Sequence, residues 1–276
     1  MTGKLIKYEF RSITKMMAIV WVALPIMALI TGISGKIGFT DAAHENKFFF
    51  ADMMEIVSSF LFGGIFMAML AVTVLMILLR FYKGLLRDEG YLMHTLPVRT
   101  WQLITAKGVV AVCVTLISIL VAFLSILFLT AFDGGIGEFF ELMAELIRSY
   151  REKPVFILIT MELIVLMVAW ITAGIYRFYA SMAIGQLAKQ HKVLLSVAAY
   201  LGIGVAGMIL MAVIGRILDL GIFESMLDVV FGWMNAFSAL EAVQAGLITL
   251  TVIAVIETAV FHIISEQILR KRLNLE

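Results

Sequence analysis

Two acidic residues lie inside long apolar runs of this 276-residue chain, and they are the first candidates for chemistry. Placing an Asp at the centre of a membrane-spanning helix costs roughly 2.5–3.5 kcal/mol on insertion scales, and a similar cost is expected for Glu162 and Glu257. Each carboxyl group must therefore be protonated, paired or in contact with water. One interpretation is a polar patch in a translocation path or at a subunit seam. The other is a structural hydrogen bond between helices, and the sequence leaves both open.

Motifs for nucleotide, metal or nucleophile chemistry are missing from the sequence. It contains no G-x-x-x-x-G-K-[ST] phosphate-binding loop and no H-E-x-x-H zinc motif. Cys113 is the only cysteine, and the four histidines are spread over separate segments, which argues against a metal site. We therefore expect no enzyme activity, no cofactor and no nucleic-acid partner for the chain itself.

A polar stretch from Arg80 to Lys107 separates two of the apolar runs. It holds five of the 21 Lys and Arg residues and an acidic turn, Asp88-Glu89-Gly90, where glycine favours the end of a helix. Pro97 forces the residue before it out of the helical region. These signals predict a short helix, acidic at one end and basic at the other, that fits a groove of a cytoplasmic partner.

A second polar stretch, Arg177–Lys192, begins with an aromatic-basic cluster. The run Tyr176-Arg177-Phe178-Tyr179 echoes Arg80-Phe81-Tyr82-Lys83 at the start of the first stretch. We interpret Arg177, Tyr179 and Gln186 as a second, weaker contact with the same partner. Aromatic-basic clusters are also common anchors at membrane interfaces, and that alternative stays open.

The elements that position these residues are membrane-spanning helices. Hydrophobic residues make up 62% of the chain and charged ones 15%, against about 25% charged in soluble domains. Crossing a hydrocarbon core takes roughly 20 helical residues, because backbone groups in lipid must pair within the segment. The sequence therefore predicts an all-α integral membrane fold, with a single membrane domain over 1–276 and six spans. These lie at about 16–33, 57–79, 103–131, 155–176, 193–214 and 245–265.

Basic residues predict the orientation of the spans. Fifteen of the 21 Lys and Arg residues fall on one side and six on the other, so both termini are expected in the cytoplasm. Residues 1–15 are predicted to form an amphipathic helix at the inner membrane surface, with Leu5, Tyr8 and Ile13 on its apolar face. On the outer side, the patterns over 137–153 and, more weakly, 217–228 predict short surface helices.

The order of residues in the first polar stretch resembles a known family. Tyr82-Lys83, Asp88-Glu89-Gly90-Tyr91-Leu92, Thr95-Leu96-Pro97-Val98 and Trp101-Gln102-Leu103 are similar to the loop between spans 2 and 3 of type-2 ABC-exporter permeases of Gram-positive bacteria. The amphipathic helix before span 1 also fits this family. The resemblance implies that the loop holds a coupling helix that contacts a cytoplasmic ABC ATPase. Its contact residues would be Asp88, Glu89, Gly90, Tyr91, Leu92 and Pro97.

The resemblance also implies the rest of an assembly in the bacterial plasma membrane. Two ATPase subunits would bind ATP and Mg, and a second permease, identical or paralogous, would complete the complex within the lipid bilayer. The cargo would be a hydrophobic or amphipathic molecule moved out of the cell or the inner leaflet, with an amphipathic peptide favoured, as in exporters of phenol-soluble modulins.

Two other functions remain open from the sequence. A secondary transporter would usually show two related halves, and spans 1–3 show no clear similarity to spans 4–6. A membrane sensor or immunity subunit for toxic peptides would also bind an ATPase. A neighbouring gene for an ATPase without spans of its own would favour the exporter.

Overall fold

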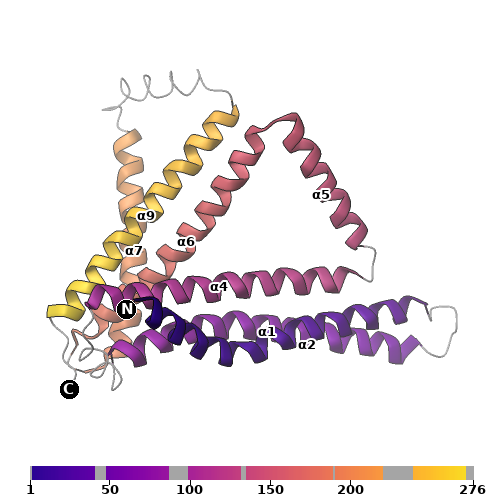
Figure 1. Cartoon of the computed structure of the whole chain (residues 1–276). Coiled ribbons are helices and arrows are strands. Elements are labelled where there is room, and N and C mark those ends of the chain that lie inside the picture. Colours follow the sequence, from indigo (N-terminus) through magenta and orange to yellow (C-terminus); the bar gives the residue numbers. More distant parts are fainter. Residues whose placement is uncertain are drawn as a thin grey trace. The chain divides into compact units, whose positions relative to one another are not determined.

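A computed structural model describes residues 2–40, 48–86, 99–131, 135–188, 190–219 and 239–271, and every regular element in these ranges is helical. The predicted all-α class is confirmed. The elements, drawn in Figure 1, are α1 (Thr2–Thr40), α2 (Phe48–Phe81), the π-helical turn η2 (Tyr82–Leu86), α4 (Thr100–Thr130), α5 (Gly135–Glu152), α6 (Val155–Gly185), α7 (Lys192–Asp219) and α9 (Ala239–Lys271).

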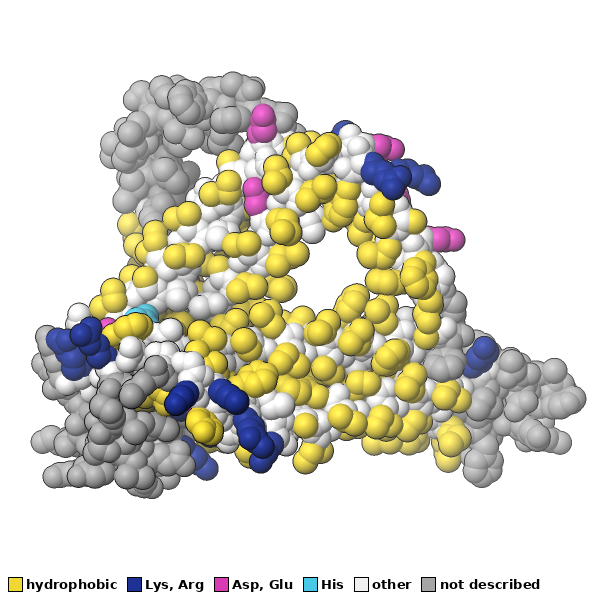
Figure 2. Space-filling view, viewed as in Figure 1, with side chains coloured by type: hydrophobic (Ala, Val, Ile, Leu, Met, Phe, Trp, Pro, Cys, Tyr) yellow, Lys and Arg dark blue, Asp and Glu magenta, His cyan; other side chains and the backbone are white. Residues whose placement is uncertain are grey.

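Six of these helices are long and apolar enough to cross a membrane, which makes the chain a multi-pass membrane protein. They are α1, α2, α4, α6, α7 and α9. Many of their large apolar side chains point outward, as the yellow surface in Figure 2 shows, and Ile19, Phe60 and Met208 are more than 70% exposed. So much outward apolar surface is expected where lipid, rather than water, surrounds the helices.

The first helix is longer than the sequence suggests. The predicted surface helix over 1–15 and the first span form one uninterrupted element, α1, with Pro25 in its interior. Lys4, Lys7 and Arg11 are exposed, as expected for the basic face. Tyr8 of the predicted apolar face is 71% exposed, and the side of α1 that packs against neighbouring helices runs through Ile6, Phe10, Ile13 and Met17.

The short helix α5 confirms the amphipathic element predicted at 137–153. None of its residues is buried, and its apolar side chains include Phe140, Leu142 and Ile147, which are all exposed. Phe139 makes an edge-on ring contact with Phe123 of α4, with ring centroids 6.3 Å apart. The weaker helix predicted at 217–228 lies largely outside the described residues.

The chain groups into two compact units, each made of two separate stretches. The first unit comprises residues 1–80 and 109–152, and the second comprises 81–108 and 153–276. The single domain predicted over 1–276 stays a prediction.

The first unit holds its helices together with an apolar cluster, with hydrogen bonds between neutral groups and with a charged contact, in which Arg80 of α2 lies 4.0 Å from Glu9 of α1 and also contacts the Ser12 hydroxyl. Ile13 and Met17 of α1 are buried against Val110 and Val114 of α4. Further along, the Trp21 indole N–H donates to the Ser118 hydroxyl at 3.0 Å, and the Ser118 hydroxyl lies 3.1 Å from that of Thr73 in α2.

In the second unit, α6 packs along both α9 and α7, and Figure 1 shows α6 and α9 side by side. Small buried residues at helical spacing, Ala173, Ala180 and Ala183, let the partner helices approach α6 closely. Against α7, Phe178 stacks on Tyr200 with ring centroids 4.5 Å apart.

Candidate functional site

Both ends of the first polar loop are buried in the second unit. Before the loop, Phe81, Leu85 and Leu86 are buried, and after it Leu103 and Ile104 are buried as well. We call the two segments 81–86 and 103–108 the loop roots. Apolar anchors on both sides fix the points at which the loop leaves the helices, since each buried side chain resists displacement into a less packed position.

Two tyrosines of α6 contact both loop roots. The Tyr179 ring stacks on Phe81, with centroids 3.9 Å apart and planes inclined by 13°. The Tyr179 hydroxyl also donates to the main-chain oxygen of Lys107 at 3.4 Å. Tyr176 lies directly against the backbone of α4 at Gly108, where an added Cβ would be 2.8 Å from the Tyr176 Cζ. Through these contacts, α6 is attached to the chain on both sides of the loop.

The residues predicted for ATPase contact fall between these roots. Asp88, Glu89, Gly90, Tyr91, Leu92 and Pro97 lie outside the described residues, and their contact with a partner stays a prediction.

The second predicted contact needs a correction in its location. The sequence placed Arg177 and Tyr179 in a loop, whereas α6 continues through both and ends at Gly185. Tyr179 and Gln186 are 1% and 4% exposed, so their side chains pack within this unit. The aromatic-basic run at 176–179 predicts the end of a span. In the structure, the helix continues to Gly185, and the rings of Tyr176 and Tyr179 are buried. A partner contact at these residues stays a prediction.

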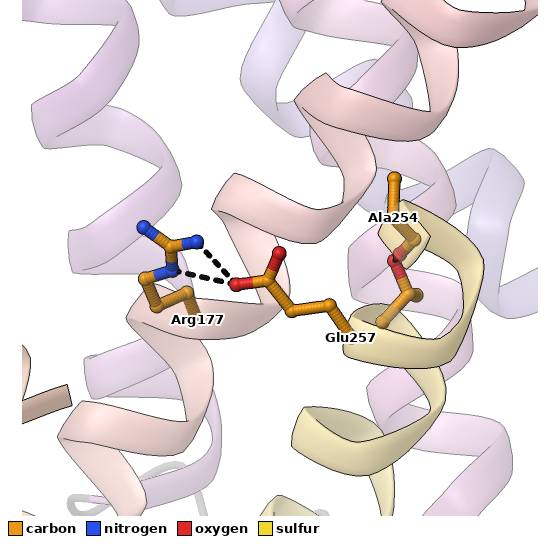
Figure 3. A network of polar contacts seen from close by, with 4 residues as sticks. Arg177, Ala254 and Glu257 are labelled. Atoms are coloured by element: carbon orange, nitrogen blue, oxygen red, sulfur yellow. Dashed lines mark hydrogen bonds and ion pairs between the residues drawn. The ribbon is translucent and has the colours of Figure 1, made fainter. Parts of the chain in front are cut away.

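Arg177 forms an ion pair with Glu257 of α9, as Figure 3 shows. The Arg177 Nε donates to Oε1 of Glu257 at 3.0 Å, and Nη2 contacts the same oxygen. The two side chains are 33% and 24% exposed, so each keeps some access to its surroundings. Of the three states open to Glu257 from the sequence, the structure shows the paired one. Pairing lowers the free-energy cost of a carboxylate in an apolar segment.

Glu162, the other intramembrane acid, has a different environment. Its Oε2 atom is buried and has no hydrogen-bond partner among the described residues. The two acids therefore differ in their contacts, because Glu257 is paired with Arg177 and Oε2 of Glu162 has no partner among the described residues.

An open groove of about 490 Å³ lies alongside α6 and α9 and reaches the first turns of α4. It is mostly apolar but contains three hydroxyls of threonine, a phenol and an imidazole. Its lining residues are Thr105, Ala169, Thr172, Tyr176, Val255, Thr258, Ala259, His262 and Ile263.

Sequence reasoning missed the part played by His262. Its ring lies edge-on to Tyr176, with centroids 5.4 Å apart, and it lines the groove. One sequence signal pointed toward the site: the two similar aromatic-basic runs contact each other through Phe81 and Tyr179. Within the described ranges, no group of three or more His, Cys, Asp or Glu residues is arranged to hold a metal ion.

Comparisons with protein-family models, with curated proteins and with solved structures gave no match to this chain.

Proposed function

We propose that this chain is the permease subunit of a type-2 ABC exporter of the bacterial plasma membrane. Its spans move a hydrophobic or amphipathic substrate, with a peptide favoured, and separate ATPase subunits bind ATP and Mg and supply the energy. A second permease, identical or paralogous, completes the complex, and both termini lie in the cytoplasm.

One observation carries this proposal: the loop whose residue order resembles the coupling loop of that family has both roots fastened to α6. Phe81 on one side and Lys107 on the other contact the same tyrosine, Tyr179. A loop anchored in this way can transmit a displacement from a bound ATPase to a span, because packed side chains transmit strain. A loop with unanchored ends would move by itself and leave the span in place.

The contacts suggest a route for such a movement. A displacement of the loop roots reaches α6 through the tyrosines, and α6 packs along α9 and α7. The Arg177–Glu257 pair joins α6 to α9 within this route. Closure of the ATPase dimer would thus tilt α6 together with its neighbours, which changes the surface that these helices offer to a substrate.

A second candidate, a secondary transporter, is favoured by Glu162 alone. Its buried, unpartnered carboxyl oxygen resembles the proton-carrying acids of transporters driven by ion gradients. In that case transport would need no ATPase.

The decisive experiment tests the loop. The chain is co-expressed with a candidate ATPase, and assembly and substrate-stimulated ATP hydrolysis are measured for Tyr91→Ala and Leu92→Ala. Truncating an interface anchor typically costs at least about 2 kcal/mol, so we expect lost co-purification or hydrolysis no longer coupled to transport. Arg99→Ala is the control, because its predicted role as a membrane-interface anchor makes its effect smaller.

Normal assembly, hydrolysis and export by both loop variants would refute the proposal. Uptake or efflux by the purified chain alone, driven by a pH gradient and abolished by Glu162→Gln, would establish the secondary transporter instead.

A further inference from the structure

The groove beside α6 and α9 brings together three threonine hydroxyls, a phenol and an imidazole. Each of its three threonines donates its hydroxyl proton to the carbonyl oxygen four residues earlier in its own helix. These distances are 2.8 Å for Thr105, 2.7 Å for Thr172 and 2.8 Å for Thr258. A hydroxyl has one proton and two acceptor lone pairs, so all three threonines can only accept hydrogen bonds from a molecule in the groove.

The two rings of the groove add to this acceptor character. Thr105 lies within hydrogen-bonding reach of the Tyr176 hydroxyl, which leaves lone pairs on the phenol oxygen. A neutral His262 imidazole has one acceptor nitrogen. No Lys or Arg is among the residues that line the groove, and Glu266, one turn along α9, is close enough to act electrostatically on His262. The polar wall thus suits a ligand rich in N–H donors.

The rest of the groove suits a hydrocarbon chain. Val255 and Ile263 of α9 line it and are 56% and 50% exposed, so an apolar body lying there would bury surface that is now uncovered. The Arg177–Glu257 pair lies apart from this wall, because adjacent helical residues such as Glu257 and Thr258 point about 100° apart around the axis. Its charges already neutralise each other.

We propose that this groove binds the primary ammonium head of an amphipathic molecule, with the apolar body along Val255 and Ile263. A primary ammonium group has three N–H donors and no acceptor, which matches clustered acceptor oxygens. This inference rests on the proposed function and names its substrate class: an amphiphile that carries an amine. The amine can belong to an aminolipid or to a lysine-bearing amphipathic peptide.

The test measures binding to the purified chain in detergent, without any ATPase. The probes are dodecylammonium and dodecyltrimethylammonium, which share their charge and chain length, but only the first has N–H donors. We expect dodecylammonium to bind about tenfold more tightly. Thr258→Val should weaken it about three- to tenfold, the range for one lost hydrogen bond, and leave the trimethyl probe unaffected.

A matched control is present on the same helix. Thr249 also donates to the carbonyl oxygen four residues earlier, at 2.8 Å, but it is exposed and does not line the groove. Thr249→Val should therefore bind dodecylammonium like the unmodified chain. His262→Phe keeps a ring beside Tyr176 and removes both nitrogens, so it should weaken binding without unfolding the helix pair. Equal affinity for the two probes, or equal effects at Thr249 and Thr258, would overturn the proposal.

Competition distinguishes the two sources of the amine. Displacement of the probe by phosphatidylethanolamine and not by phosphatidylcholine identifies a lipid headgroup. Displacement by a short Leu–Lys amphipathic peptide, lost when its amines are acetylated, identifies a peptide. Competition by neither would mark dodecylammonium as an adventitious additive only and overturn the proposal.

Failure of this inference is separable from failure of the proposed function. A chain that assembles with an ATPase and couples hydrolysis to transport, yet shows no preference for the N–H-bearing probe, refutes the groove alone. Selective binding with no ATPase coupling refutes the exporter and leaves the groove standing.

Discussion

Two contacts between helices, one in each compact unit, differ in kind. In the first unit, Ser118 of α4 accepts from Trp21 and lies beside Thr73, and all three groups are neutral. In the second, Arg177 and Glu257 join α6 to α9 through opposite charges. The first unit has a charged contact as well, but its Arg80–Glu9 distance of 4.0 Å is longer than the 3.0 Å hydrogen bond from Arg177 Nε to Glu257. The loop roots and the groove belong to the unit that contains the Arg177–Glu257 pair.

The difference matters because breaking the neutral Ser118 contact and breaking the Arg177–Glu257 ion pair have different consequences. A neutral hydroxyl that loses its partner in a membrane often finds another, and such bonds average only about 0.6 kcal/mol. A charged side chain that loses its partner stays in an apolar environment, where no other group compensates its charge at low free-energy cost. Substitution of Arg177 is therefore expected to have a larger effect than substitution of Ser118, and the predictions below test that ranking.

The largest effect is expected from breaking the ion pair. Arg177→Leu leaves the Glu257 carboxylate without its partner and should lower the free energy of unfolding by about 2–3 kcal/mol. This is below the usual range for fully buried pairs, because the side chains are 33% and 24% exposed. The measurement is an SDS titration of the purified chain, followed by circular dichroism.

The double variant Arg177→Leu/Glu257→Leu is the control for this prediction. It removes both charges, so it should recover most of the lost stability. A double variant as unstable as the single one would show that the pair is not the source of the effect.

A smaller effect is expected where α6 meets α7. A Cβ added at Gly185 would lie 2.7 Å from the Lys192 carbonyl oxygen and 2.8 Å from the Ser196 Cβ. The backbone oxygen cannot rotate away as a side chain would, so Gly185→Ala should cost about 1–3 kcal/mol by overpacking.

Gly174 provides the matched control in the same helix. A Cβ at Gly174 meets no other atom within 4 Å, so Gly174→Ala should be neutral or slightly stabilising, since alanine favours the helix. Thermal unfolding of both variants in detergent checks the pair. Equal melting temperatures would contradict the close approach at Gly185.

The six spans could be predicted from the sequence because hydropathy and helix length are local properties. The Arg177–Glu257 pair could not, since the two residues are 80 positions apart and only the packing of α6 on α9 brings them together. The end of α6 was placed too early for a related reason. Arg177 looks like the start of a polar loop, but its charge is balanced by Glu257, and Tyr179 is covered by Phe81.

The buried side of α1 was also only partly predictable. Helical spacing placed Tyr8 and Ile13 near one face, whereas Ile13 is buried and Tyr8 is exposed. Periodicity gives the width of an apolar face, but the packing partners, Val110 and Val114 of α4, decide which edge of that face is covered.

The smallest effect should come from the neutral contact in the first unit. Ser118→Ala removes the acceptor of the Trp21 N–H, but Thr73 keeps its own bond to the Met69 carbonyl at 2.7 Å. We expect a loss of about 0.6 kcal/mol in the free energy of unfolding, by the average for such bonds in membranes. The same SDS titration measures it.

Ser125→Ala on the same helix separates the interhelical bond from the loss of a hydroxyl. Ser125 is buried like Ser118, but its hydroxyl donates at 2.7 Å to the Val121 carbonyl within α4, so the bond that is removed is not one between helices. The difference between the two variants therefore isolates what Trp21 and Thr73 contribute. A Ser118→Ala loss as large as that of Arg177→Leu would contradict the contrast between these two contacts, because a neutral hydroxyl would then matter as much as a charge left without its partner.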